Sequence, residues 1–178
     1  MQALNRIARL SRLLGWVTSF LIYALPVTLI LAAVPGVLPT GMLDAALPKV
    51  PPVTQVTPFK TALCLSAGWL ALLPLIWALV EMKGLFARYA QGDILSPECA
   101  RHILRTGQAL VAVALMGIAT RALQGLALTY DNPPGQKMLA IGIDGATAGF
   151  ILAGGPLVAI GWVMGEAARV AEDNRGFL

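Results

Sequence analysis

Four long stretches without a charged residue dominate the sequence of this 178-residue chain. They cover residues 13–43, 61–80, 106–120 and 145–165. A helix that crosses the hydrocarbon core of a bilayer needs about 20 mainly apolar residues. The stretch at 106–120 is short of this length unless Arg121 lies near a membrane interface, and the other stretches reach it directly. The sequence therefore predicts an all-α membrane protein with four transmembrane helices.

The composition supports a membrane protein over a soluble one. Apolar residues make up 57% of the chain and charged residues only 12%, against roughly 25% charged residues in soluble domains. We expect a single transmembrane domain over residues 1–178, arranged as an up-down four-helix bundle. Its predicted parts are spans at about 13–34, 61–81, 104–128 and 143–165, a cytoplasmic helical hairpin at 82–103 and an amphipathic tail at 166–178.

The first span follows Arg6, Arg9 and Arg12, a pattern that also begins a secretory signal. The apolar run continues from Leu13 to about Val34, whereas the core of a signal peptide has about 7–15 residues. We therefore expect an uncleaved first span.

The positions of Lys and Arg predict the orientation. Nine of the 13 lie in the N-terminal segment, the 81–105 connection and the C-terminal tail, and four lie in the remaining segments. Cytoplasmic loops carry the excess of Lys and Arg, so both termini and the central connection should be cytoplasmic. Acidic residues flank these cations, which argues against direct nucleic acid binding.

The segment from Met82 to Gly107 predicts two helical extensions joined by a tight turn. Gly92 suits the position after a helix end. Ser96, Pro97 and Glu98 suit the first positions of the next helix. On that helix, we expect Glu98 to pair with Arg101 and His102.

The stretch "LFARYAQGDILSPECARHILRTGQAL" resembles the central signature of domain of unknown function family 2975, a family of small bacterial inner-membrane proteins with four spans. The matching positions are Leu85, Phe86, Tyr89, Gly92, Ile94, Leu95, Ser96, Pro97, Glu98, Cys99, Ala100, Arg101 and Gly107. The tail "GEAARVAEDNRGFL" is similar to the family's ending. The resemblance implies a multi-pass protein of the bacterial cytoplasmic (inner) membrane with no settled activity. Some members are thought to be encoded beside small helix-turn-helix regulators, which implies a regulatory partner.

Catalytic chemistry is not apparent in the sequence. The chain has one histidine, His102, and no phosphate-binding loop, nucleophile elbow or Ser/His/Asp set. We expect no enzyme activity, no cofactor and no metal site. The nine acidic residues all fall in loops or at span ends, which disfavours a proton-coupled pump.

The first functional hypothesis is a membrane sensor or regulator that docks a cytoplasmic protein on its hairpin and tail. The predicted partner-binding residues are Arg88, Asp93, Glu98, Arg101, Arg105, Arg169, Glu172 and Asp173. A merely solvated charged face is the alternative for this set.

Small residues in the fourth span predict close helix packing. They are Gly145, Gly149, Gly154, Gly161 and Gly165. Whether this packing lies within one bundle or across a homodimer stays open. A second hypothesis is therefore an accessory subunit of a larger membrane complex.

A third hypothesis is a transporter for a small solute or lipid, with a polar cavity between helices kinked at Pro26, Pro74 and Pro156. The residues expected to line it are Thr18, Ser19, Tyr23, Thr28, Ser66 and Thr147. Arg121 is the one cation expected within a span, where it would either snorkel toward the interface or pair with Asp131 or Asp144.

Overall fold

The computed structural model describes residues 2–34, 57–94, 96–139 and 141–175. Its helices are α1 (Gln2–Ala33), α3 (Pro58–Ala90), α4 (Pro97–Thr129) and α5 (Gly145–Arg175). All four are long and apolar enough to cross a membrane. The prediction of an all-helical protein with four such helices is confirmed. Most of the connection between α1 and α3, residues 35–56, lies outside the described residues.

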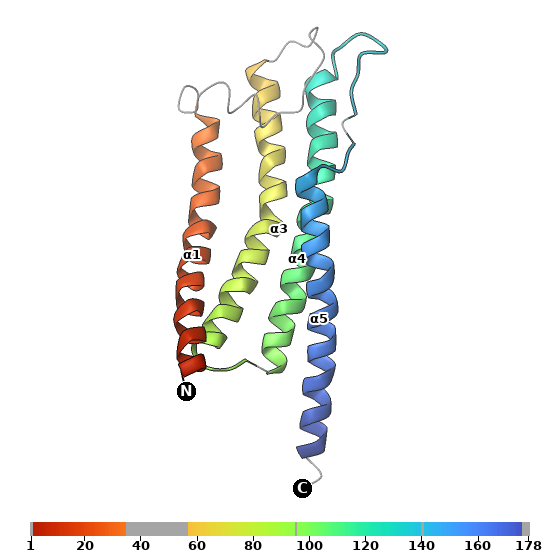
Figure 1. Ribbon diagram of the computed structural model, residues 1–178. Helices are drawn as coiled ribbons and strands as arrows, with labels where there is room; N and C mark the ends of the chain where they lie inside the picture. The colour runs from red at the N-terminus through yellow and green to blue at the C-terminus, as the bar shows by residue number, and fades with distance from the viewer. Residues whose placement is uncertain (1, 35–56, 95, 140, 176–178) are drawn as a thin grey trace.

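The helices pack in chain order. Over the described part of the chain, α1 packs on α3, α3 on α4 and α4 on α5. In Figure 1, α1 and α5 lie at opposite sides of the array, and both chain ends lie at the same end as the turn between α3 and α4. The start of α5 lies partway along α4 rather than beside its end (Figure 1). The connection after α4 therefore descends along the array before α5 begins.

Glycine allows the backbones of α4 and α5 to touch. A Cβ atom added at Gly107 would lie 2.6 Å from the amide nitrogen of Val158, and one at Gly161 would lie 2.5 Å from that of Leu104. At Gly154 the added atom would lie 2.8 Å from the carbonyl oxygen of Gly107. Such a close approach maximises van der Waals contact, which is a main source of helix association in lipid.

The other predicted packing glycines have looser surroundings. An added Cβ at Gly145 or Gly149 would have no neighbour within 4 Å, and at Gly165 it would lie 3.9 Å from the Cβ of Ala100. The structure therefore places Gly154 and Gly161 at the tight α4–α5 contact, together with Gly107, which was not among the predicted packing residues.

Small side chains and one amide form the contact between α3 and α4. Ala78, Cys99 and Ala109 are almost completely buried. Gln124 Nε2 donates a hydrogen bond of 3.0 Å to the carbonyl oxygen of Cys64. Both cysteines are free and buried.

Each proline within a helix is accommodated without a break. The helical segments continue through Pro26 in α1, Pro74 in α3 and Pro156 in α5. Pro74 is buried, and in membranes such positions are tolerated where neighbouring groups satisfy the freed carbonyls.

Large apolar side chains cover the outside of the array. Trp16 is 80% exposed, Leu152 is 74% exposed and Trp162 is 69% exposed. Soluble monomers rarely expose contiguous apolar surface of this kind, whereas lipid solvates it. Together with the four long apolar helices, this surface suggests a multi-pass membrane protein.

We expect Gly107→Ala and Gly161→Ala to destabilise the protein, because the new methyl group would collide with backbone atoms of the neighbouring helix. Overpacking of this kind costs about 1–3 kcal/mol. The measurement is the unfolding free energy in a denaturing-detergent titration.

Gly149→Ala is the matched control, since its new methyl group would meet no atom within 4 Å. Equal unfolding free energies for the three variants would contradict the assignment of the α4–α5 contact.

Candidate functional site

The turn between α3 and α4 is held by a compact polar network. Arg88 Nη1 lies 3.3 Å from Asp93 Oδ2 and 3.9 Å from Glu98 Oε2. The Ser96 hydroxyl donates to Asp93 Oδ2 at 2.7 Å and accepts from the amide of Cys99 at 3.3 Å. These contacts tie the end of α3 to the start of α4, so the turn has a defined shape.

Two expected features of this turn are present in the structure. Gly92 has a φ angle of +85°, a conformation that favours glycine. Ser96 is the N-cap of α4 and Pro97 occupies its first turn. Leu95 lies outside the described residues.

The predicted partner-binding residues fall into separate groups. Arg88, Asp93 and Glu98 come together at the turn. Arg101 and Arg105 are exposed on α4. Arg169 pairs instead with Glu166 on α5, at 2.9 Å. The helix of α5 extends through residues 172 and 173, but the side chains of Glu172 and Asp173 are not among those described.

A second polar cluster lies between α3 and α4. Its central residue, Glu81, directly precedes the predicted hairpin at 82–103. Glu81 is only 8% exposed. Its Oε2 lies 2.7 Å from Nδ1 of His102, and its Oε1 accepts from Trp77 Nε1 at 3.3 Å and lies 3.5 Å from Nη1 of Arg105. The burial of the carboxylate is thus offset by several hydrogen-bonding partners.

The His102 ring packs directly over Gly84. An added Cβ at Gly84 would lie 2.6 Å from Cε1 of the ring, so only glycine leaves room for it. The expected pairing of His102 with Glu98 is therefore replaced by a contact between helices. Glu81 follows the buried Ala78 by three residues, which puts both on the same face of α3. The burial of Ala78 is seen only in the structure, so the sequence carries no direct signal of this contact.

At the opposite end, α3 is tied to the connection that follows α4. Lys60 is 2% exposed and its Nζ lies 2.5 Å from Asp131 Oδ1, with the Tyr130 ring centroid 5.4 Å from Nζ. The hydrogen bond from Lys60 lowers the pKa of the Asp131 carboxyl below its ordinary value. The two residues are 71 positions apart in the chain, so their spacing in the sequence gives no signal of the pair.

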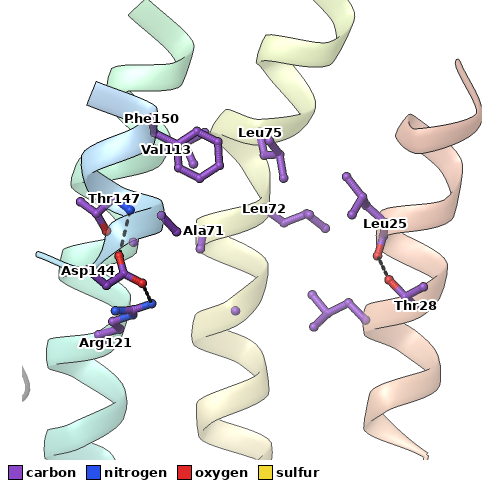
Figure 2. Close-up of a pocket in the computed structure, with 14 residues that line it drawn as sticks. Leu25, Thr28, Ala71, Leu72, Leu75, Val113, Arg121, Asp144, Thr147 and Phe150 are labelled. Carbon is purple, nitrogen blue, oxygen red and sulfur yellow. Dashed lines mark hydrogen bonds and ion pairs between the residues drawn. The ribbon is translucent and has the colours of Figure 1, made fainter. Parts of the chain in front are cut away.

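Arg121 pairs with Asp144, one of the two expected acids. Arg121 Nη2 lies 2.5 Å from Asp144 Oδ2. The other carboxylate oxygen of Asp144 accepts a 2.8 Å hydrogen bond from the amide of Thr147, as expected of a residue that caps a helix start. Figure 2 shows this relay from α4 through Asp144 to the first turn of α5.

The ion pair borders a groove of about 470 Å³ between α1, α3, α4 and α5. Leu25 and Leu29 line it from α1, and Phe150 lines it from α5. Figure 2 shows Leu72 and Leu75 of α3 in the region between these walls. Of the polar residues predicted to line a cavity, Thr28 and Thr147 do so here, and Ser19 lines a smaller hollow of about 280 Å³ between α1 and α3.

These sites differ in the chemistry that they can support. The hairpin offers exposed charges to water and to a protein. The groove offers an apolar surface with one ion pair at its border, as small-molecule sites commonly do. Among the residues that the structure describes, no group of three or more His, Cys, Asp or Glu side chains could hold a metal ion.

We expect Glu81→Ala to lower the unfolding temperature in detergent, because His102, Trp77 and Arg105 would lose a shared acceptor. Hydrogen bonds to a charged group such as this carboxylate each contribute about 1.5–3 kcal/mol. Glu166→Ala is the control, since the side chain of Glu166 is 61% exposed. An equal effect of both changes would show that the cluster contributes no more than a surface charge.

The comparisons with known proteins agree with the sequence resemblance. The family model described as "Protein of unknown function (DUF2975)" matches residues 22–175, which include the C-terminal part of α1 and all of α3, α4 and α5. No match was found among the curated proteins or among the solved structures. The matched range covers well over half of the chain, and the protein therefore belongs to the DUF2975 family.

Proposed function

We propose that this protein is a non-enzymatic regulator of the bacterial cytoplasmic membrane, with both termini and the α3–α4 turn in the cytoplasm. In this proposal the helices form an up-down transmembrane bundle, and the cytoplasmic hairpin docks a regulatory protein. The observation that carries the proposal is the ordered, ion-paired turn at Arg88, Asp93 and Glu98.

The proposed orientation is supported by charge and by shape. Nine of the 13 Lys and Arg residues lie in the two terminal segments and the central connection. These three segments lie at one end of the structure (Figure 1). The positive-inside rule assigns such an end to the cytoplasm.

The hairpin has features of a docking surface rather than of a simple connection. A few turn residues could join two antiparallel helices, yet α3 continues for nine residues beyond Glu81, to Ala90. The network around Arg88 is ordered but partly accessible, with 35% of the Arg88 side chain and 46% of the Glu98 side chain exposed. A preformed surface costs little ordering entropy when a partner binds.

The accessory-subunit hypothesis remains as the alternative, on one specific observation. Gly145 and Gly149 are exposed on α5 and an added Cβ at either would meet no atom within 4 Å. A helix of a second protein, or of a second copy, could approach α5 closely at these positions.

The orientation predicts opposite labelling of two introduced cysteines. Gln136→Cys, in the α4–α5 connection, should react with a membrane-impermeant maleimide in intact spheroplasts, and Gln91→Cys should react only after lysis. Both positions are exposed, whereas the neighbouring Asn132 is buried. The wild type supplies the background, because its two cysteines are buried. Reaction of Gln91→Cys in intact spheroplasts would contradict the proposed orientation and place the α3–α4 turn outside the cytoplasm.

The docking proposal predicts that Arg101→Glu weakens the binding of the partner protein to the hairpin. A photoreactive amino acid at Gln91 should cross-link one cytoplasmic protein in native membranes, and the charge reversal should reduce its yield about tenfold, which corresponds to about 1.4 kcal/mol. Arg101 is chosen because it is exposed on α4 near the turn, whereas Cys99 is completely buried. Lys137→Glu is the matched charge reversal at the opposite end and should change nothing.

A different result would favour the alternative. If Gly149→Leu abolishes co-purification with a membrane protein while Arg101→Glu has no effect on any cross-link, the protein acts as an accessory subunit. Cross-links only to lipid and to a second copy would remove the docking function.

A further inference from the structure

We propose that the groove bordered by Arg121 and Asp144 binds a membrane phospholipid, with an acyl chain along the apolar walls and the phosphate on Arg121. This inference goes beyond the docking function and does not depend on it. It depends on the α1–α5 array lying in a bilayer, which the four long apolar helices suggest.

The walls of the groove suit hydrocarbon. Large apolar side chains line it from three helices, including Leu29, Leu72 and Phe150. Small residues also line it, among them Gly68, Ala71, Gly117 and Ala146. An added Cβ at Gly117 would meet no atom within 4 Å, so the space beside α4 is not filled by the protein itself.

The helix arrangement exposes this space to the surroundings. The helices that pack extensively on one another within the described segments are neighbours in the chain, and α1 and α5 are not such a pair. Leu25 of α1 and Phe150 of α5 nevertheless line the same groove, and Figure 2 shows them on opposite sides of α3. Empty apolar space loses van der Waals contacts. In a bilayer, the neighbouring hydrocarbon is the acyl chain of a lipid.

The position of Arg121 suits a lipid headgroup that lies alongside α4, about two turns before the C-terminal end of this helix. Eight residues of α4 follow Arg121, up to Thr129, which corresponds to about 12 Å of helix. A charged group at such a depth is costly and usually marks a functional site or a specific pair. Here 46% of the Arg121 side chain is exposed despite its contact with Asp144.

The ion pair orients a guanidinium that has more donors than Asp144 uses. Nη2 of Arg121 donates to one oxygen of Asp144, and a guanidinium carries five N–H donors. Phosphate is a geometrically matched acceptor for these donors. Because Asp144 also offsets the charge of Arg121, an ion without a hydrocarbon tail should bind weakly. The combination therefore favours a phospholipid over free phosphate.

The first test fills the groove. The full-length protein is reconstituted in vesicles of phosphatidylethanolamine and phosphatidylglycerol that contain phosphatidylglycerol with a diazirine at the end of one acyl chain. We expect photolabelling of peptides from α3, α4 and α5 that line the groove. Gly117→Leu should reduce that labelling about tenfold, because the larger side chain occupies the open space.

The matched control is Ala119→Leu, on the exposed side of the same helix and outside the groove lining. It should label like the wild type. Equal labelling of all three proteins would mean that the reagent reports bulk lipid, and the proposal would be wrong.

The second test separates the headgroup contact from helix capping. Arg121→Gln should lower retention of phosphatidylglycerol in native mass spectrometry about tenfold, as expected for the loss of one charge-assisted hydrogen bond. Asp144→Asn keeps a side-chain oxygen for the amide of Thr147 but leaves Arg121 uncompensated, so retention should rise. A fall in both variants would indicate a purely structural pair and contradict the headgroup contact.

Inorganic phosphate distinguishes the source of the ligand. Its addition should leave the photolabelling unchanged, since the acyl chain contributes to binding. Displacement of the lipid by phosphate alone would overturn the lipid assignment. If Arg121→Gln does not fold, as judged by circular dichroism and gel filtration, the comparison of Gly117→Leu with Ala119→Leu decides the proposal.

Discussion

The close contact between the backbones of α4 and α5 is the constraint on which the rest of the structure depends. Gly107, Gly154 and Gly161 allow it, because a β-carbon at any of them would collide with the facing helix. The contact determines how far along α4 the helix α5 begins. It thereby brings Asp144, at the start of α5, to the level of Arg121 on α4, and the groove beside this pair is a consequence of the same register.

Charged residues join segments that are distant in the chain. Lys60 meets Asp131 at one end of the array, and Glu81 meets His102 and Arg105 toward the other end. A buried charge is tolerable when it is paired and hydrogen-bonded. These contacts align α3 with α4 at both ends, so the hairpin and the groove are built on a well-supported pair of helices.

The sequence predicted the local parts of the candidate sites better than the contacts between helices. The start of α4 at Ser96 and the turn at Gly92 follow from local conformational preferences, and the structure has both. Sequence spacing paired His102 with Glu98 on one helix, whereas the structure pairs it with Glu81 on another. For Arg121, spacing left Asp131 and Asp144 as equal candidates, since each follows α4 in the chain. Only the descent of the connection toward the start of α5 selects Asp144.

The sequence by itself determined the number of long apolar helices and the ends of several of them. These properties depend on the length of apolar runs and on residues adjacent in the chain. The tertiary structure decided which glycines touch another helix, since Gly154 and Gly161 face α4 while Gly145 and Gly149 do not. It also decided which charges meet and where a groove remains. These outcomes depend on the rotation and offset of each helix relative to its neighbour, which all the contacting side chains determine together.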